Sequence, residues 1–421
     1  MHHFHYQAGR LHCEDVSLDR IADEVGTPVY VYSTATLERH ADVIQRAFSD
    51  IDALIAYSVK ANGNLGVLAT LGRAGCGADV VSGGELQRAM AAGISPDKIV
   101  FSGVGKTRDE MELALMAGIH QFNVESAAEL ETLSFVAIEM DRVAPISLRV
   151  NPDVAAGGHP NISTGKQGDK FGVPWADAEA LYGRARDLPG IHPVGVDVHI
   201  GSQIDQLGPM EAAFTKTLGL ATRLREAGHD ITRLDLGGGL GIPYAPGDDP
   251  APPADYAAMI RRVIGEMPLQ IILEPGRVIA GNAGVMVTEA LYQKPAPDRT
   301  FLVVDAGMND LMRPALYSAH HDIVPVREPE TPIDTAPLDI VGPICESTDK
   351  FAAARHLPPV SAGDRLAILS AGAYGAVLSS QYNSRPLVPE VLVDGAEYAI
   401  VRRRPSFEEM ITLEALPDWL T

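Results

Sequence analysis

The chain has 421 residues, of which 46% are hydrophobic and 21% charged, and its formal net charge is −21. This length allows two domains with a large core, and the negative charge argues against nucleic acid and anionic membrane surfaces as partners. Cys13, Cys76 and Cys345 follow neither a zinc-ligand nor a disulfide spacing, so we expect a reducing, cytoplasmic location. We expect no signal peptide, no membrane-spanning segment and a frayed, histidine-rich N-terminus.

A short helical pattern opens the chain, followed by a strand-like run at 29–32 and an amphipathic helical pattern at 34–48. From residue 55 onward, strand-like and helical segments alternate. The strand-like runs end near residues 60, 82, 102, 125, 151, 201, 237 and 274, and helical segments begin near 64, 83, 107, 126, 175, 210 and 255. A capping-box pattern marks three of these helix starts, at Ser82, Thr107 and Ser126.

About eight strands over roughly 220 residues, nearly all followed by a helix, predict a (β/α)8 barrel. An open doubly wound sheet is the competing arrangement. Its dinucleotide-binding version is disfavoured, because no glycine-rich Gly-x-Gly-x-x-Gly turn follows the first alternating strand.

After about residue 280, short strand-like runs are separated by proline, glycine and aspartate, which is typical of a mainly β domain. These runs lie at 285–288, 301–304, 338–341, 365–369, 390–393 and 398–401. We therefore expect residues 34–280 to form the barrel and residues 1–33 with 281–421 to form the second domain.

Lys60 stands at the exit of an apolar, strand-like segment, 55–59, and is followed by a turn at 62–66. A lysine at the end of a buried strand loses hydration unless a partner compensates. One interpretation is that Lys60 extends its ammonium group to solvent. The other is a desolvated amine with a lowered pKa that forms a Schiff base with a carbonyl compound.

Polar residues and glycines recur at the ends of the other predicted strands. Barrel enzymes build their active sites at the C-terminal ends of the strands, so the recurrence predicts a shared site. Its candidate members are Lys60, Asp79, Ser82, Asn151, His199, Ser202, Gly237, Gly238, Gly239, Glu274, Gly276 and Arg277.

Each of these motifs has a structural and a chemical interpretation. The three glycines at 237–239 form either a plain turn or a nest of N–H groups for a phosphate, to which Arg277 would add a fork of donors. Glu274 either pairs with a nearby cation or keeps a pyridine nitrogen protonated, which makes the ring an electron sink. His199 is either a satisfied core histidine or a ring that stacks on a flat cofactor.

Taken together, the motifs resemble the diaminopimelate decarboxylases, pyridoxal-phosphate enzymes with the alanine-racemase-type barrel. The resemblance runs in the family's order over nearly the whole chain. It rests on segments 57–62 (YSVKAN), 199–203 (HIGSQ), 237–239 (GGG), 274–277 (EPGR), 308–317 (MNDLMRPALY), 342–347 (GPICES) and 372–375 (GAYG).

The resemblance implies roles for individual residues. Lys60 would hold pyridoxal 5'-phosphate covalently, and His199 and Cys345 would join it as catalytic residues, with Cys345 protonating the carbanion. Cofactor contacts would come from Asp79, His199, Ser202, Gly237, Gly238, Gly239, Glu274, Gly276, Arg277 and Tyr374. Substrate contacts would come from Arg277, Arg313, Tyr317, Glu346 and Tyr374. No metal is expected.

In this family Cys345 and its neighbours come from the partner subunit, so the resemblance implies a homodimer, with the second domain supplying substrate and dimer contacts. The ordinary interpretation of a single cysteine is a small buried hydrophobe. Arg313 argues for a substrate with a distal carboxylate and Glu346 for a distal ammonium group. These features imply conversion of meso-2,6-diaminopimelate to L-lysine and CO2, the last step of lysine biosynthesis.

Three rival functions stay open at this stage. One is a decarboxylase of the same fold that acts on ornithine, arginine or carboxynorspermidine. Another is an amino-acid racemase, which would need a weaker electron sink than Glu274 suggests, and the third is a non-catalytic pyridoxal-phosphate carrier. His320 and His321 stand where the family often has an aromatic residue, and the sequence predicts no role for either.

Overall fold

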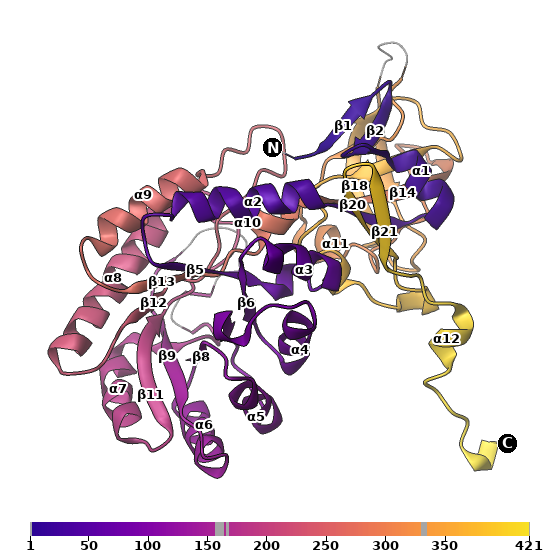
Figure 1. Ribbon diagram of the computed structural model, residues 1–421. Coiled ribbons are helices and arrows are strands. Elements are labelled where there is room, and N and C mark those ends of the chain that lie inside the picture. Colours follow the sequence, from indigo (N-terminus) through magenta and orange to yellow (C-terminus); the bar gives the residue numbers. More distant parts are fainter. Residues whose placement is uncertain (1, 156–163, 166–167, 330–334, 421) are drawn as a thin grey trace. The chain divides into compact units, whose positions relative to one another are not determined.

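The computed structural model describes residues 2–155, 164–165, 168–329 and 335–420 (Figure 1). By their contacts, these residues divide into two compact units, one of residues 37–280 and one of residues 1–36 with 281–421.

The first unit is built on eight parallel strands that close on themselves. They are β5 (Ala53–Ser58), β6 (Gly77–Val80), β7 (Ile99–Phe101), β8 (Gln121–Val124), β9 (Ala144–Asn151), β11 (Ile191–Asp197), β12 (Arg233–Asp235) and β13 (Gln270–Leu273). Each strand pairs with the next one in this order, and β13 pairs back with β5. The predicted (β/α)8 barrel is therefore confirmed, and the open sheet is wrong. A two-residue strand, β10 (Val173–Pro174), pairs with β9 outside this ring.

Helices surround the barrel (Figure 1), which explains why its strands are almost continuously buried. They are α2 (Thr34–Ala47), α3 (Leu65–Arg73), α4 (Gly83–Ala91), α5 (Arg108–Ala117), α6 (Ala127–Glu139), α7 (Ala178–Asp187), α8 (Leu207–Glu226), α9 (Pro253–Ile264) and α10 (Arg277–Ala280). The first of them, α2, precedes β5, and the others follow barrel strands.

The helix starts at Ser82, Thr107 and Ser126 are confirmed, because each of these side chains caps its helix. Only Thr107 completes a reciprocal capping box. The glutamates expected to close the other two boxes, Glu85 and Glu129, reach one residue further back and accept the N–H groups of Val81 and Glu125. The prediction of a full box at Ser82 and Ser126 is wrong for that reason.

The second unit is mainly β. Its large sheet has the order β18-β17-β15-β14-β4-β20-β21; β19 also pairs with β14, and β16 pairs with β19. The strands are β4 (Val29–Ser33), β14 (Gly284–Pro295), β15 (Thr300–Val304), β16 (Ile323–Pro325), β17 (Ala336–Val341), β18 (Lys350–Leu357), β19 (Arg365–Ile368), β20 (Glu390–Asp394) and β21 (Glu397–Arg402). All six strand-like runs predicted after residue 280 are confirmed, whereas β16 and β18 were not foreseen.

The N-terminal segment belongs to this unit. Strand β4 lies between β14 and β20, and its alternate valines join a core cluster with valines of both neighbours. Ahead of it, β1 (Phe4–Gln7), β2 (Arg10–Cys13) and β3 (Val16–Ser17) form a small sheet, followed by α1 (Leu18–Val25). The expected frayed N-terminus is wrong, because Phe4 is buried and the N–H of His3 donates to Thr36 Oγ1 at 3.0 Å.

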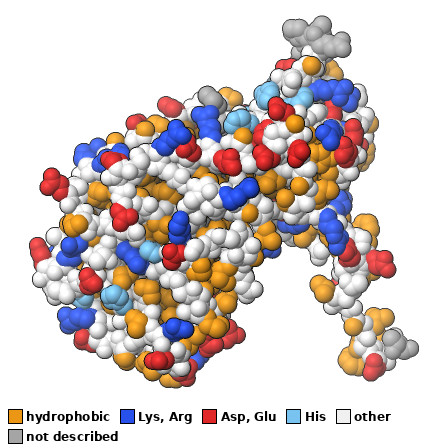
Figure 2. Space-filling view, viewed as in Figure 1, with side chains coloured by type: hydrophobic (Ala, Val, Ile, Leu, Met, Phe, Trp, Pro, Cys, Tyr) orange, Lys and Arg blue, Asp and Glu red, His pale blue; other side chains and the backbone are white. Residues whose placement is uncertain are grey.

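The C-terminal segment of this unit carries α12 (Phe407–Ile411), which a complete Ser406–Glu409 capping box starts. Figure 2 shows apolar side chains on its surface, and Phe407, Leu413 and Trp419 are 69%, 95% and 84% exposed. None of the helices in the described ranges combines the length and the apolar character that crossing a bilayer requires.

Candidate active site

Lys60 lies just past the end of β5, in the single 3-10 turn Val59–Ala61. Its Nζ is 2.6 Å from Oδ2 of Asp79, a fully buried residue of β6, and the hydroxyl of Ser58 donates to the same oxygen at 2.8 Å. The lysine side chain is 32% exposed. Lys60 is therefore only partly exposed to solvent, and a buried carboxylate holds its amine at the barrel mouth.

Glu274 follows β13 and is also buried. Its Oε1 accepts hydrogen bonds from Ser102 at 3.1 Å and from Asn123 at 3.3 Å. Burial raises the pKa of Glu274 well above its ordinary value, and the neighbouring carboxylates of Asp235 and Asp79 add to the rise.

His199 is an acceptor at Nδ1, because the N–H of Gly238 donates to that atom at 3.1 Å. The same nitrogen lies 4.0 Å from Glu274 Oε2. Burial lowers the pKa of His199 well below its ordinary value, and the cations Arg149 and Lys60 lower it further. The ring is therefore neutral, carries its proton on Nε2 and is held in one orientation, as stacking on a flat cofactor requires.

The three glycines at 237–239 do not form the predicted three-donor nest. The N–H of Gly237 donates to Asp235 and the N–H of Gly238 to His199, so the prediction of both as phosphate N–H donors is wrong. Among the described residues, the N–H of Gly239 has no acceptor. Gly239 has φ +108°, and a Cβ there would lie 2.4 Å from the carbonyl oxygen of Gly201, so only glycine fits. Gly239 remains a phosphate-binding candidate.

Arg277 begins α10 directly after Gly276 and is buried. It donates to Tyr244 Oη at 2.6 Å and to Ser202 Oγ at 3.0 Å. The structure thus brings together two predicted residues, Arg277 and Ser202, which are far apart in sequence. Tyr244 was missed, because it lies in the long loop between β12 and α9, where the sequence offers no periodic signal.

Two other strand-end candidates have structural roles. Ser82 caps α4, and the Oδ1 atom of Asn151 accepts the N–H of Asp153 at 2.9 Å, which stabilises the turn after β9. Neither observation connects them to the chemistry of the site.

Three buried carboxylates of the barrel form a cluster in which their oxygens lie within 4.8 Å of one another. They belong to Asp197, Asp235 and Glu274. Such spacing allows a shared proton or a bound cation. Asn123 donates to both Asp235 and Glu274. Because an amide donor inside the cluster competes with a cation, we favour shared protons.

Burial and the neighbouring carboxylate of Asp235 raise the pKa of Asp197 well above its ordinary value, and burial likewise raises the pKa of Asp235. Neither residue was predicted, although they end β11 and β12, because the predicted strands extended to Gly201 and Gly237.

This cluster predicts how the stability of cofactor-free protein depends on pH. A carboxyl group whose pKa is raised by folding stabilises the folded state below its unfolded-state pKa, which is about 4. This stability is lost as the pH rises through the pKa of the group in the folded state. We therefore expect the urea midpoint to fall between pH 4 and 8, and to fall less in Asp235→Asn. An equal fall in both proteins would contradict proton sharing in the cluster.

In the second unit, Arg313 and Tyr317 are the first and last residues of α11 (Arg313–Tyr317), and Arg313 is buried. Cys345 and Glu346 lie in the loop between β17 and β18, and both are exposed. The interpretation of Cys345 as a buried hydrophobe is therefore wrong. Tyr374 follows β19, half-buried, with a left-handed backbone at φ 56°.

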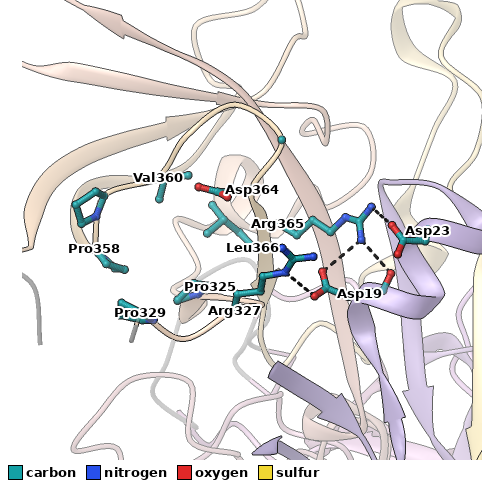
Figure 3. Close-up of a pocket in the computed structure, with 12 residues that line it drawn as sticks. Asp19, Asp23, Pro325, Arg327, Pro329, Pro358, Val360, Asp364, Arg365 and Leu366 are labelled. Carbon is teal, nitrogen blue, oxygen red and sulfur yellow. Dashed lines mark hydrogen bonds and ion pairs between the residues drawn. The ribbon is translucent and has the colours of Figure 1, made fainter. Parts of the chain in front are cut away.

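The same unit contains a cavity of about 200 Å³, lined by prolines and charged residues (Figure 3). Arg327 donates to Asp19 at 2.8 Å, and Arg365 contacts Asp19 at 3.3 Å and Asp23 at 2.6 Å. These arginines neutralise the carboxylates of α1 and tie this helix to β19. The cavity includes none of the residues that the sequence predicts for the site.

A family model described as the pyridoxal binding domain of pyridoxal-dependent decarboxylases matches residues 34–281. A diaminopimelate decarboxylase from Pseudomonas aeruginosa is 50% identical over 417 residues, 98% of this chain and 99% of that protein. A crystal structure of the Helicobacter pylori diaminopimelate decarboxylase complexed with L-lysine has a TM-score of 0.90 at 40% identity, covering 94% of this chain and 98% of that one. The M. jannaschii enzyme, also in complex with L-lysine, has a TM-score of 0.94 at 34% identity, covering 99% of both chains.

Proposed function

Because this chain belongs to the diaminopimelate decarboxylase family of pyridoxal-dependent decarboxylases, we propose that it converts meso-2,6-diaminopimelate to L-lysine and CO2, the last step of lysine biosynthesis. The observation that supports this most directly is the pairing of Lys60 with Asp79 at the barrel mouth, beside the buried carboxylate of Glu274.

The side chains of the barrel fit pyridoxal 5'-phosphate. Lys60 would supply the amine for its aldehyde, Glu274 would face its ring nitrogen, and His199 would offer a neutral ring to stack on it. Arg277 and the N–H of Gly239 would supply donors for its phosphate. When bound, this cofactor accepts the electrons that a departing carboxylate leaves behind.

The chain itself positions the reacting groups. The hydrogen bonds of Ser102 and Asn123 fix the Glu274 carboxylate, and the N–H of Gly238 fixes the His199 ring. Arg313 would bind the distal carboxylate of the substrate and Glu346 its distal ammonium group. A substrate such as ornithine lacks that carboxylate, so Arg313 would be left without its substrate partner.

A CO2-release assay on the separate stereoisomers of diaminopimelate tests the function. With added pyridoxal phosphate we expect release from the meso isomer, and little release without the cofactor. Ornithine, arginine, carboxynorspermidine and lysine serve as comparison substrates. Faster turnover of any of these, or racemisation without CO2 release, would overturn the proposal.

We also propose a homodimer in which Cys345 of one subunit completes the site of the other. Cys345 is exposed within its own chain, and the apolar side chains around α12 suit burial against a second copy. The cytoplasmic location suggested by the cysteine pattern stays a prediction.

Mixing two inactive variants tests the shared site. Lys60→Ala and Cys345→Ala are each expected to lose most activity alone. After subunit exchange, random pairing gives mixed dimers with one intact site, so about a quarter of wild-type activity should return. If exchange is verified by differential tagging and no activity returns, Cys345 does not act across the interface.

A further inference from the structure

The guanidinium group of Arg313 contacts a buried histidine, His321. Its Nη1 lies 2.7 Å from Nε2 of His321, and the two side chains come from opposite ends of the segment 313–321. His321 is 1% exposed and Arg313 is 6% exposed. The contact is therefore formed away from solvent, where a hydrogen bond to a charged group is strong.

The geometry fixes which atom of His321 carries the proton. A guanidinium group can only donate, so Nε2 accepts. The other ring nitrogen, Nδ1, lies 2.8 Å from the carbonyl oxygen of Leu369, which can only accept, so Nδ1 carries the hydrogen. The bond to the Leu369 carbonyl oxygen thus fixes the orientation of the His321 ring, and Nε2 of the ring offers Arg313 an acceptor in a fixed position.

The support for this histidine is rigid. The N–H of Leu369 donates to the carbonyl oxygen of Asp322 at 2.8 Å, which extends the pairing of β16 with β19 up to the histidine. Arg355 of β18 donates to the carbonyl oxygen of His321 at 2.9 Å. Strands β18 and β19 therefore both anchor His321.

We propose that His321 is a positioning residue that aims Arg313 at the distal carboxylate of the substrate. This inference rests on the proposed function, because it takes the carboxylate as the partner of Arg313. A flexible guanidinium must be ordered before it can bind a carboxylate bidentately, and the fixed acceptor on His321 lowers that cost before substrate arrives.

The alternative is that His321 only fills the core and stabilises the sheet. Two substitutions separate these roles. In His321→Gln, an amide oxygen is placed where Nε2 was, so the acceptor for Arg313 is kept. In His321→Asn, the shorter amide keeps a donor for the Leu369 carbonyl but cannot reach Arg313. A positioning role predicts rescue by glutamine, whereas a sheet-anchoring role predicts rescue by asparagine.

The readouts are KM and kcat for meso-diaminopimelate and the Kd for L-lysine, which retains the distal carboxylate. We expect His321→Asn to raise both KM and Kd about tenfold, the cost of a charge-assisted contact, with kcat changed by less than about threefold. His321→Gln should stay within about threefold of wild type. His320→Gln is the matched control, because the neighbouring His320 is exposed and its ring contacts Asp322 and Arg355 rather than Arg313.

Arg313→Ala separates failure of this inference from failure of the proposed function. If Arg313→Ala weakens L-lysine binding but His321→Asn leaves both KM and Kd unchanged, the positioning role is refuted. If Arg313→Ala itself leaves L-lysine binding unchanged, the proposed role of Arg313 is refuted. A loss of kcat with unchanged KM in His321→Asn would also contradict the inference.

Discussion

Replacing Lys60 with alanine is expected to lower turnover of meso-diaminopimelate by at least about a thousandfold, since the position supplies a nucleophilic amine that no other group replaces. The same variant should lack the visible absorbance of covalently held cofactor. Among the described residues, the other lysine of the barrel buried in an ion pair is Lys106, which is engaged by Glu129 at 2.8 Å and so cannot substitute. Steady-state CO2 release and an absorbance spectrum of the purified protein measure both effects.

Lys98→Ala is the matched control, because Lys98 ends the short 3-10 turn Pro96–Lys98 before β7 and is exposed. It should behave as wild type in both measurements. Thermal unfolding of Lys60→Ala shows whether the variant folds. If a folded Lys60→Ala protein retains both the absorbance and turnover, or if borohydride reduction traps the cofactor on another lysine, Lys60 is not the cofactor residue.

The strand-end rule explains why part of this site was predictable. In a closed parallel barrel all strands present their C-terminal ends at one mouth, so Lys60, Asp79 and Glu274 could be grouped from the alternation of strands and helices alone. The structure places these three residues close together: Lys60 pairs with Asp79, and the hydroxyl of Ser58 lies within hydrogen-bond distance of both Asp79 and the carbonyl oxygen of Glu274.

The supporting residues could not be predicted in the same way. The partners of Glu274 are Ser102, directly after β7, and Asn123, within β8, and only the closure of the barrel brings them together. The Arg313–His321 contact depends on the turn that follows α11. The hydrophobic periodicity of a sequence predicts helices and strands. It does not predict which side chains of different elements come into contact in the folded protein.

The assignment of the second domain to substrate and dimer contacts remains a prediction.

Most strands of the second domain were predictable, because each predicted run is β-branched or apolar and is bounded by turn residues. Strand β18 was not, because its middle residues are three alanines followed by an arginine, a composition without strand preference.

The second large effect concerns stability. Arg149 of β9 pairs with Glu125 at 2.9 Å, and the two side chains are only 8% and 1% exposed. Glu125 also accepts the N–H groups of Gly103 and Gly172, at 2.9 and 3.0 Å. Replacing Arg149 with methionine fills similar space but leaves the Glu125 carboxylate charged, buried and without its cation. We expect a loss of about 3–5 kcal/mol in the free energy of unfolding.

Urea unfolding of the cofactor-free proteins measures this loss, and a surface pair provides the control. Arg223 of α8 and Glu179 of α7 form an ion pair at 2.7 Å, but their side chains are 49% and 58% exposed. Arg223→Met should cost less than about 1 kcal/mol. Equal losses in the two variants would show that solvent reaches Glu125.

A double variant distinguishes loss of attraction from the penalty of an uncompensated charge. In Arg149→Met with Glu125→Gln, the neutral amide oxygen can still accept the N–H groups of Gly103 and Gly172, while the unpaired charge is gone. If the penalty of the buried charge dominates, the double variant should be more stable than Arg149→Met alone. If the double variant is less stable, the charged carboxylate of Glu125 stabilises the fold even without Arg149. The hydrogen bonds from the N–H groups of Gly103 and Gly172, rather than the ion pair, would then be its main stabilising interactions.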